Sequence, residues 1–229
     1  MTRSAKPGQQ VLVALRRLIA DGTIKPGMRI GEIATAERLG VSRMPVRTAL
    51  RALEHEGLVV KLGARGYTPR AVNAETIRGA IEVRGVLEGL AARHVAARHL
   101  QDEERVRLAQ VLACGNAIFE KGHFVSEDLD RFYRYNLDFH ELLLALSSNP
   151  SISLALERNN HLPFASAAAL ALDWDDLDAE YVHLRHAHEE HMAVFDAICA
   201  GNAVLAERLM RDHARAAISN GRIFKGLRV

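Results

Sequence analysis

The stretch that decides the fold is "LGVSRMPVRTALRALEHEGLVV", which runs from Leu39 to Val60. Its three arginines, Arg43, Arg47 and Arg51, are spaced four residues apart and therefore share one stripe of a helix. The N-terminus of a helix carries a partial positive charge, which disfavours cations in the first turns. The stripe therefore indicates an anion outside the chain that binds there.

The same stretch carries the signals of one complete helix. Ser42 is a good N-cap, and Pro45 falls in the first turn, where a missing N–H removes a donor that has no partner. Gly57 ends the helix. Apolar residues at helical spacing predict a buried face opposite the arginines. That face consists of Val46, Ala49, Leu50 and Leu53.

The flanking segments predict a small DNA-binding fold. Residues 11–19 and 31–39 have helical spacing, with a turn at "KPGM" between them, and "GARG" at 63–66 is a basic hairpin tip. Helix, helix, turn, helix and hairpin is the order of a winged helix-turn-helix, whose second motif helix lies in the DNA major groove. Arg43 and Arg47 are then placed for phosphates or base edges. The alternative is a solvated arginine face on a core helix.

The charge distribution divides the chain into two parts. Residues 1–72 hold 13 Lys and Arg against 5 Asp and Glu, whereas residues 73–229 hold 17 against 23. The first part is therefore basic by +8 and the second acidic by −6, and ten of the eleven histidines lie in the second. This asymmetry predicts a domain at 1–72 that meets a polyanion and a domain at 73–229 with another task.

The bulk composition of the 229 residues is that of an ordinary globular protein. No apolar run is long enough for a bilayer, and "MTRSAKPGQQ" lacks the apolar core of a signal peptide, so we expect a cytoplasmic protein with no membrane partner. Cys114 and Cys199 are isolated within helical patterns. We expect them to be reduced packing residues.

Helical periodicity dominates the second part, where no segment alternates like a strand. Asn73 and Ser126 are candidate caps, and Pro163 interrupts the pattern between residues 150 and 172. The periodicity predicts an all-α bundle of six or seven helices. The fold class is therefore mainly α, with an N-terminal winged helix-turn-helix and a C-terminal bundle.

Four polar residues of this bundle are candidate metal ligands. Asn136 and His140 are separated by four residues and share a helix face, and His191 and His213 lie midway along two later helices beside apolar positions. Three inward imidazoles could hold a divalent metal, with the Asn136 oxygen as a weaker fourth ligand. The alternative is that each histidine is a hydrogen-bonded core residue or a solvated one.

The first 70 residues resemble the DNA-binding domain of GntR-family transcription factors. The resemblance rests on "PGMRIGEIATAERLGVSRMPVRTALRALEHEGLV". It implies DNA contacts by the helix and by the wing at 63–66, and it leaves operator preference open because Met44 and Ile33 depart from the family pattern. Together with the arginine stripe, the predicted DNA-binding residues are Ser42, Arg43, Pro45, Arg47, Arg51, Gly63, Arg65 and Gly66.

The second part resembles the FCD effector domain of the FadR-type GntR subfamily. The resemblance rests on "EVRGVLEGLAARHVA", "NLDFHELLLALSSNP" and "EEHMAVFDAICAGNAVLAERLMRDHAR". It implies a metal on Asn136, His140, His191 and His213, with Zn²⁺ favoured over Ni²⁺ or Mn²⁺, and Asn136 stands where metal-binding members have Asp. Arg84 lies at a position near the cavity in this family, so Arg84 and its neighbour Glu88 are predicted to bind effector. The alternative is an exposed Arg84–Glu88 ion pair.

These features predict a transcriptional regulator and not an enzyme. A homodimer would bind double-stranded operator DNA, most simply as a repressor, and a small carboxylate effector would bind the metal-centred cavity. One alternative is a metal-dependent hydrolase fused to a DNA-targeting domain, with Glu88 as general base and with Glu141 and Glu190 pointing away from the metal. Another is an architectural DNA-binding protein. The histidines at 183, 186 and 188 are predicted to lie mainly on the helix surface.

Overall fold

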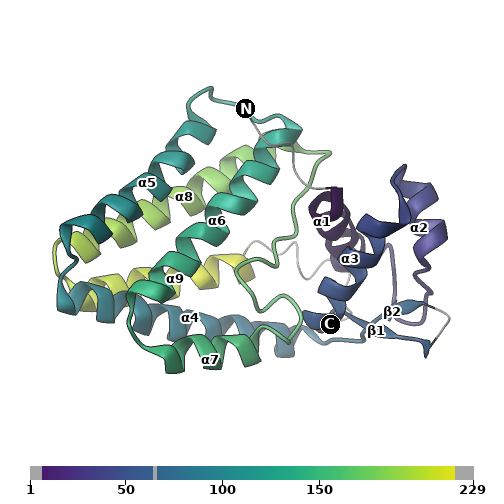
Figure 1. Cartoon of the computed structure of the whole chain (residues 1–229), viewed down its shortest axis with the longest axis horizontal. Helices are drawn as coiled ribbons and strands as arrows, with labels where there is room; N and C mark the ends of the chain where they lie inside the picture. Colours follow the sequence, from purple (N-terminus) through teal and green to yellow (C-terminus); the bar gives the residue numbers. More distant parts are fainter. Residues whose placement is uncertain (1–6, 64–65, 220–229) are drawn as a thin grey trace.

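The computed structural model describes residues 7–63 and 66–219 and places the chain in two domains (Figure 1). The smaller domain is a winged helix-turn-helix, as predicted. Its two strands form an antiparallel hairpin in which Val60 pairs with Thr68. Its elements are α1 (Pro7–Ala20), α2 (Glu32–Leu39), α3 (Arg43–His55), β1 (Val59–Lys61) and β2 (Tyr67–Pro69).

The turn between α2 and α3 has the local chemistry of the motif. Gly40 ends α2 in the left-handed conformation with φ +64°, which a glycine adopts without strain. Ser42 occupies the N-cap position of α3 in an extended conformation, but its side chain accepts no capping hydrogen bond within the described chain. Val46 and Leu50 are completely buried, and they hold α3 against the rest of the domain.

Six helices make up the larger domain within the described residues, in agreement with the predicted bundle. Asn73 caps the first of them by accepting a hydrogen bond of 2.7 Å from the Thr76 N–H. Ser126 is the first residue of its helix, and Asp128 instead accepts from the Val125 N–H in the N-cap position. The helices are α4 (Ala74–Arg98), α5 (Asp102–Phe119), α6 (Ser126–Leu146), α7 (Pro150–Asn159), α8 (Leu177–Cys199) and α9 (Ala203–Ser219).

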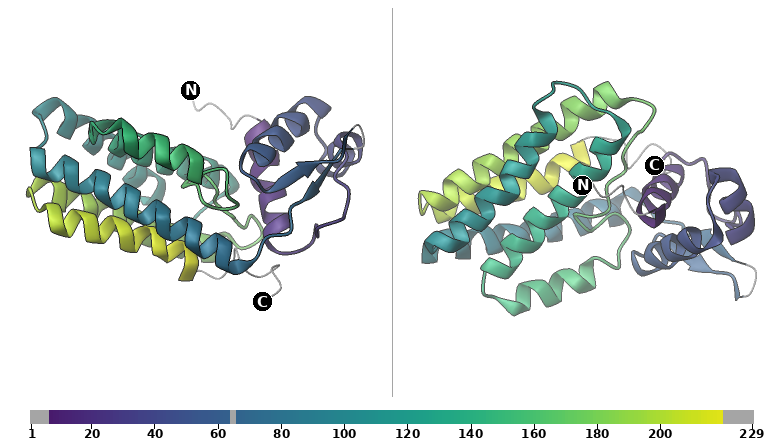
Figure 2. Two further views of the ribbon diagram at one scale, coloured as in Figure 1. Left: turned by 90° about the horizontal axis from the view of Figure 1, so that it is seen from below. Right: turned by 45° about the horizontal axis from the view of Figure 1, so that its top comes forward.

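Helices α4 and α9 run side by side at close range, as Figure 2 shows. Two glycines one helical turn apart on α4 allow this approach. A Cβ atom at Gly89 would lie 2.9 Å from the Glu207 carbonyl oxygen, and one at Gly85 would lie 3.1 Å from the Ala214 side chain. The tight α4–α9 pair brings Arg84 and Glu88 of α4 close to His213 of α9.

The two cysteines do not pack in the core as predicted. Both are free, and both are exposed on the faces of α5 and α8 that point away from the core. The sequence pattern could not reveal this, because Cys114 and Cys199 each have apolar neighbours on both faces. No helix in the described part of the chain is both long and apolar enough to cross a membrane.

Candidate nucleic-acid interface and metal centre

The arginine stripe lies on the exposed face of α3, opposite its buried face. Arg43 and Arg51 are exposed, Arg47 is partly covered, and all three line a groove together with Lys61 of β1. The groove ends at Gly63 and Gly66 of the hairpin and is about 940 Å³ in volume. Ser42 is also exposed and Pro45 is half-buried, while Arg65 lies outside the described residues. The structure therefore gathers cations where helix and wing meet.

Glu32 of α2 holds two of these arginines, which sequence reasoning missed. Its carboxylate accepts hydrogen bonds of 2.9 and 2.8 Å from Arg47, and it lies 3.5 Å from Arg43. The hydrogen bond from Arg47 lowers the pKa of Glu32, so this carboxylate is charged at neutral pH. The sequence did contain a signal for this contact: Glu32 is the first residue of the helix that precedes the helix with the arginine stripe.

The wing needs glycine where the hairpin passes the turn before α2. Gly66 has φ +109°, and a Cβ atom there would lie 2.6 Å from the Ile30 carbonyl oxygen. The adjacent Tyr67 exchanges backbone hydrogen bonds of 2.7 and 3.0 Å with Ile30. The base of the wing is thus fixed to the body of the domain.

Three histidines from three helices meet inside the bundle. His140 of α6 and His191 of α8 are buried, and the His213 side chain on α9 is 9% exposed. One ligand nitrogen from each lies within 4.8 Å of the others, and the Nε2 atoms of His191 and His213 are 3.1 Å apart. The structure thus brings together the three histidines that the sequence predicted as metal ligands.

The Nδ1 atom of each histidine has its own hydrogen-bond partner. His140 Nδ1 is 3.0 Å from Glu88 Oε1, and His213 Nδ1 is 2.7 Å from Glu190 Oε2. A carboxylate only accepts, so both Nδ1 atoms carry a hydrogen, and in the neutral ring the lone pair is then on Nε2. This is the arrangement in which histidine binds a metal through Nε2.

A chain of neutral groups fixes the third ring. Asn116 Oδ1 lies 2.8 Å from His188 Nε2, so that nitrogen donates and His188 Nδ1 accepts from the Tyr135 hydroxyl at 2.7 Å. The Tyr135 oxygen then accepts from His191 Nδ1 at 2.9 Å. The Nε2 lone pair of His191 is therefore also free, and it points at that of His213.

Two acceptor nitrogens 3.1 Å apart repel each other unless a cation joins them. Two ligands at the usual Zn–N distance of about 2.0–2.1 Å lie roughly 3.0 Å apart at 90° and roughly 3.3 Å apart at the tetrahedral angle. Burial, with the neighbouring histidines, lowers the pKa of His191 well below its ordinary value, which disfavours a shared proton. The residues present therefore fit a divalent metal.

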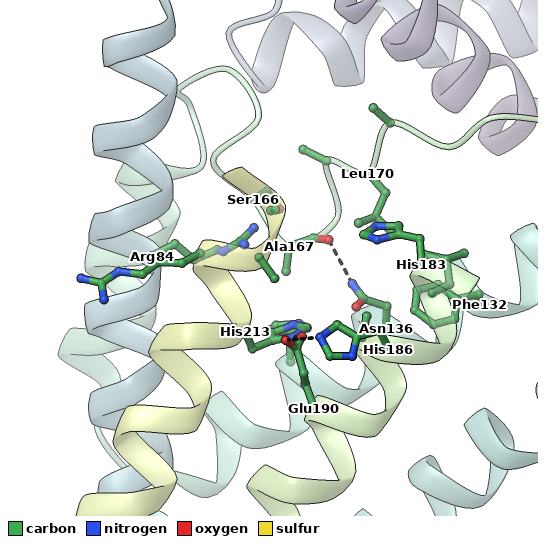
Figure 3. Close-up of a pocket in the computed structure, with 18 of the residues that line it drawn as sticks. Arg84, Phe132, Asn136, Ser166, Ala167, Leu170, His183, His186, Glu190 and His213 are labelled. Atoms are coloured by element: carbon green, nitrogen blue, oxygen red, sulfur yellow. Dashed lines mark hydrogen bonds and ion pairs between the residues drawn. The ribbon is translucent and has the colours of Figure 1, made fainter. Parts of the chain in front are cut away.

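Asn136 lies beside this cluster and can contribute only its oxygen. Its Nδ2 donates a hydrogen bond of 3.0 Å to the Ala167 carbonyl, which Figure 3 shows as a dashed line. The side-chain oxygen of Asn136 is thus left for the cavity. An amide oxygen is a weaker and uncharged ligand compared with the carboxylate of the family pattern.

A cavity of about 570 Å³ opens next to the histidines (Figure 3). Asn136, His140 and His213 form one wall, and Arg84 also lines it. The rest of the lining combines apolar side chains with polar and charged ones: Phe132, Phe164, Leu170, Leu172 and Leu184, and His183, His186, Glu190, Asp212 and Arg215. This combination of apolar and polar side chains is typical of small-molecule sites.

Arg84 is a buried cation with incomplete pairing. Only 6% of the residue is exposed, and its Nε has no hydrogen-bond partner in the described structure. Its two contacts with carbonyl oxygens, of Ala165 and Ala214, are both long at 3.4 Å. Burial lowers the pKa of Arg84. An anion in the cavity would complete its hydrogen bonding.

Several sequence expectations about this site need correction. The Arg84–Glu88 pair is buried, not exposed, with 3.7 Å between Arg84 Nε and Glu88 Oε2. Glu88 lies behind His140 and does not line the cavity. Glu190 was expected to point away from the metal site, yet it holds His213, because helix α9 packs beside that face of α8.

Of the three extra histidines of α8, His186 is exposed as predicted, His183 is half-buried, and His188 is buried. His183 and His186 line the cavity, and Figure 3 shows His186 beside Glu190 and His183 near Leu170. His188 is buried 5.4 Å from the Phe119 ring, on which it stacks. The sequence could not separate these roles, because the helix faces of α8 are covered on two sides, by α5 and by α9.

The fold and the basic groove define a DNA-binding regulatory protein, and comparison with known proteins gives its family. Residues 7–68 match the bacterial regulatory proteins of the gntR family, and residues 80–216 match the FCD domain. The chain belongs to the GntR family, in the group that carries an FCD domain. It is a transcriptional regulator with a DNA-binding domain, and not an enzyme.

Relatives of this chain carry regulator names. "Uncharacterized HTH-type transcriptional regulator YdhC" of Bacillus subtilis is 34% identical over 65% of this chain and 64% of its own length. "Probable D-xylose utilization operon transcriptional repressor" of Paenarthrobacter nicotinovorans is 30% identical over 86% of this chain and 81% of its own. Among solved structures, Escherichia coli McbR/YncC has the same fold, with a TM-score of 0.60, 22% identity and coverage of 96% and 98%.

Proposed function

We propose that this protein is a repressor whose operator binding is controlled by a small organic acid held at a metal centre in the FCD domain. The observation that carries the proposal is the convergence of one ring nitrogen from each of three histidines at the end of a mixed polar and apolar cavity. Repression is supported by the names of two relatives, the D-xylose repressor above and "HTH-type transcriptional repressor RspR" of Escherichia coli.

On the DNA side, α3 enters the major groove with Arg43, Arg47 and Arg51, and the wing at Gly63–Gly66, including Arg65, contacts the adjacent backbone. Ser42 and Pro45 place the first turn of α3 against phosphate. A homodimer presents two such domains, so its operator is pseudo-palindromic, with half-sites related by the protein's two-fold axis. We place this activity in the cytoplasm, where the DNA is.

On the effector side, His140, His191 and His213 hold the metal through Nε2, and Asn136 adds its oxygen. Zn²⁺ suits this mainly nitrogen donor set, and Ni²⁺ or Mn²⁺ are the other candidates. When bound, the ion supplies a Lewis-acid anchor for a carboxylate. The four ligands are all uncharged, so none of them neutralises the ion directly, and an anionic effector is a suitable further ligand.

The cavity also indicates the kind of acid. Arg84 adds a second cation, and its two terminal nitrogens, which make only long contacts with carbonyl oxygens, suit a carboxylate. The apolar wall formed by Phe132, Phe164 and Leu170 suits a short hydrocarbon or aromatic body. Glu88 contributes indirectly, because it orients His140 and sits beside Arg84.

Operator binding with and without acid tests the proposal. An operator duplex selected from random DNA is titrated by fluorescence anisotropy in Zn²⁺, with a panel of small carboxylates, against the native protein and His140→Ala. We expect one carboxylate to change the operator affinity of the native protein by about 5–150-fold, the range of typical allosteric coupling.

His140→Ala is expected to bind the duplex as well as the native protein does and to lose the response to the acid. Circular dichroism checks that the variant is folded. Exposed His123→Gln, 4 residues beyond the end of α5, serves as the matched histidine control and should respond normally. A full response in His140→Ala would remove this cluster from the effector site.

A further inference from the structure

The segment between α7 and α8, residues 160–176, contacts both the cavity and the DNA-binding domain. It contains no helix or strand, and Figure 1 shows it as a green trace that runs between the bundle and α1. Ala167 and Ala169 line the cavity. The carbonyl of Ala168, between them, instead accepts a hydrogen bond of 2.7 Å from Arg16 of α1. One short piece of backbone thus serves both domains.

Arg16 is the centre of this contact. It is completely buried, and its Nε donates a hydrogen bond of 2.8 Å to Glu56, the residue that follows α3. Its guanidinium therefore joins three parts of the molecule: α1, the end of the recognition helix, and the wall of the cavity. A planar guanidinium fixes the direction of each of these hydrogen bonds.

Apolar side chains join the same two regions. Phe164 and Ala169 line the cavity, and both also belong to the buried core of the DNA-binding domain with Leu15 and Leu50. Phe164 is 3% exposed, so it is packed on both sides. A ligand in the cavity would therefore touch side chains of the core that supports α3.

Ion pairs and hydrogen bonds fasten both ends of the segment. Arg17 of α1 lies 3.0 Å from Asp173 and 2.7 Å from Asp175. At the other end, the His161 ring nitrogen is 2.8 Å from the carbonyl of His55, the last residue of α3. The segment is thus attached to the DNA-binding domain at its beginning, middle and end.

We propose that residues 160–176 are the element that couples the cavity to the orientation of the DNA-binding domain, with Arg16 as the positioning residue. The proposal rests on the proposed function, since it takes the cavity as the effector site. Close packing makes such a contact discrete: a shift of the Ala168 carbonyl has to break the Arg16 hydrogen bond or move α1 with it. By linkage, DNA binding must act back on the same segment.

This reciprocity provides a test that needs no effector. Hydrogen exchange is measured on the full-length protein with and without an operator duplex, in the native chain, in Arg16→Gln and in Arg93→Gln. Arg93 forms an ion pair of 3.0 Å with Glu207 at the surface of the helical domain, so its variant is the control for loss of an Arg–Glu pair away from the segment. Protection of α3 by DNA shows in every sample that the duplex is bound.

In the native protein and in Arg93→Gln, DNA is expected to change exchange in residues 160–176 by about fivefold or more, the low end of typical coupling. In Arg16→Gln this change should disappear, while the protection of α3 remains. Unchanged exchange of the segment in the native protein would overturn the proposal. The same response in Arg16→Gln as in the native protein would also overturn it.

Two further measurements distinguish failure of this proposal from misfolding of a variant and from failure of the proposed metal centre. If circular dichroism shows Arg16→Gln to be unfolded, Arg17→Gln replaces it, because its ion pairs are partly exposed; a native-sized response there overturns the proposal. Zn²⁺ alone is added in a parallel series. Absence of any Zn²⁺ effect around His140 would count against the metal centre, while the DNA arm still decides the coupling.

Discussion

The arginine stripe of α3 and the histidine cluster of the bundle are both groups of three basic side chains, but they are built in opposite ways. The arginines lie at an exposed surface, and two of them, Arg43 and Arg47, share a single carboxylate, that of Glu32. Each histidine is enclosed and has its own partner, Glu88, Glu190 or Tyr135. The arginines can therefore exchange a carboxylate for a DNA phosphate, whereas the histidines are arranged to bind a single ion.

The difference has an energetic reason. Exposed arginines lose little when they leave a carboxylate for a phosphate, because surface ion pairs contribute little to stability. Buried histidines that present lone pairs to one another gain only when a cation arrives. Changes at the first site should therefore act on DNA affinity alone, and changes at the second on metal, pH and effector response.

The largest effect is expected from Arg47→Ala. Loss of this side chain should weaken operator binding by roughly 1–3 kcal/mol, because Arg47 is placed to bind phosphate or a base edge. Fluorescence anisotropy measures the effect, and circular dichroism checks the fold. The metal content of the variant should be that of the native protein. Equal operator affinity in the two proteins would exclude Arg47 from the interface.

A smaller loss is expected from Tyr135→Phe, at the second site. Removal of the hydroxyl leaves His191 Nδ1 without its acceptor, and loss of such a partner typically weakens metal binding by about 10–100-fold. Competition with a chromogenic chelator measures Zn²⁺ affinity. Tyr181→Phe, a partly buried tyrosine in the same bundle, is the control. Native Zn²⁺ affinity in Tyr135→Phe would show that the hydroxyl does not orient His191.

The metal-free protein should lose stability in acid through His191. Burial lowers the pKa of His191 in the folded state, so the unfolded chain binds the proton more readily. The free energy of unfolding should then fall as pH drops below about 6.5, by up to about 1.4 kcal/mol per pH unit from this residue. Urea unfolding in a chelator at pH 5.5 and 7.5 measures it. His191→Phe should flatten the slope; an unchanged slope contradicts the assignment.

The smallest effect is expected from Glu32→Gln. Without the carboxylate, Arg43 and Arg47 are freed and a negative charge near the DNA is removed. Binding to non-operator DNA should strengthen by less than about 1 kcal/mol, since the pair is solvent-exposed, and discrimination should fall accordingly. Titrations against operator and random duplexes at two salt concentrations measure both. Weaker binding to random DNA would contradict this role for Glu32.

The sequence predicted the winged helix-turn-helix because its signals are local. The spacing of Val46, Leu50 and Leu53, the glycine after each helix and the basic hairpin depend only on neighbours in the chain. The six-helix bundle followed from periodicity in the same way. The course of the chain after Asn159 was harder to predict from the sequence. The segment 160–176 is held by contacts with α1 and α3, which are far away in the sequence.

The candidate site was predictable in its ligands but not in their supports. Periodicity placed His140, His191 and His213 on inward faces. It could not show that Glu190 reaches His213 or that Glu88 reaches His140, because these contacts depend on how α8 and α4 are rotated against α9 and α6. His188 was predicted to lie at the surface but is buried, because helix α8 is covered on more than one face.

The most direct test of the metal centre is the metal content of the protein without an affinity tag, beside His191→Ala. Both proteins are equilibrated with Zn²⁺, dialysed, and analysed by plasma mass spectrometry. The geometry predicts one ion per chain in the native protein and loss of that ion in the variant, with the helical circular dichroism signal retained. No bound ion in the native protein, or the same content in His191→Ala, would contradict the metal centre.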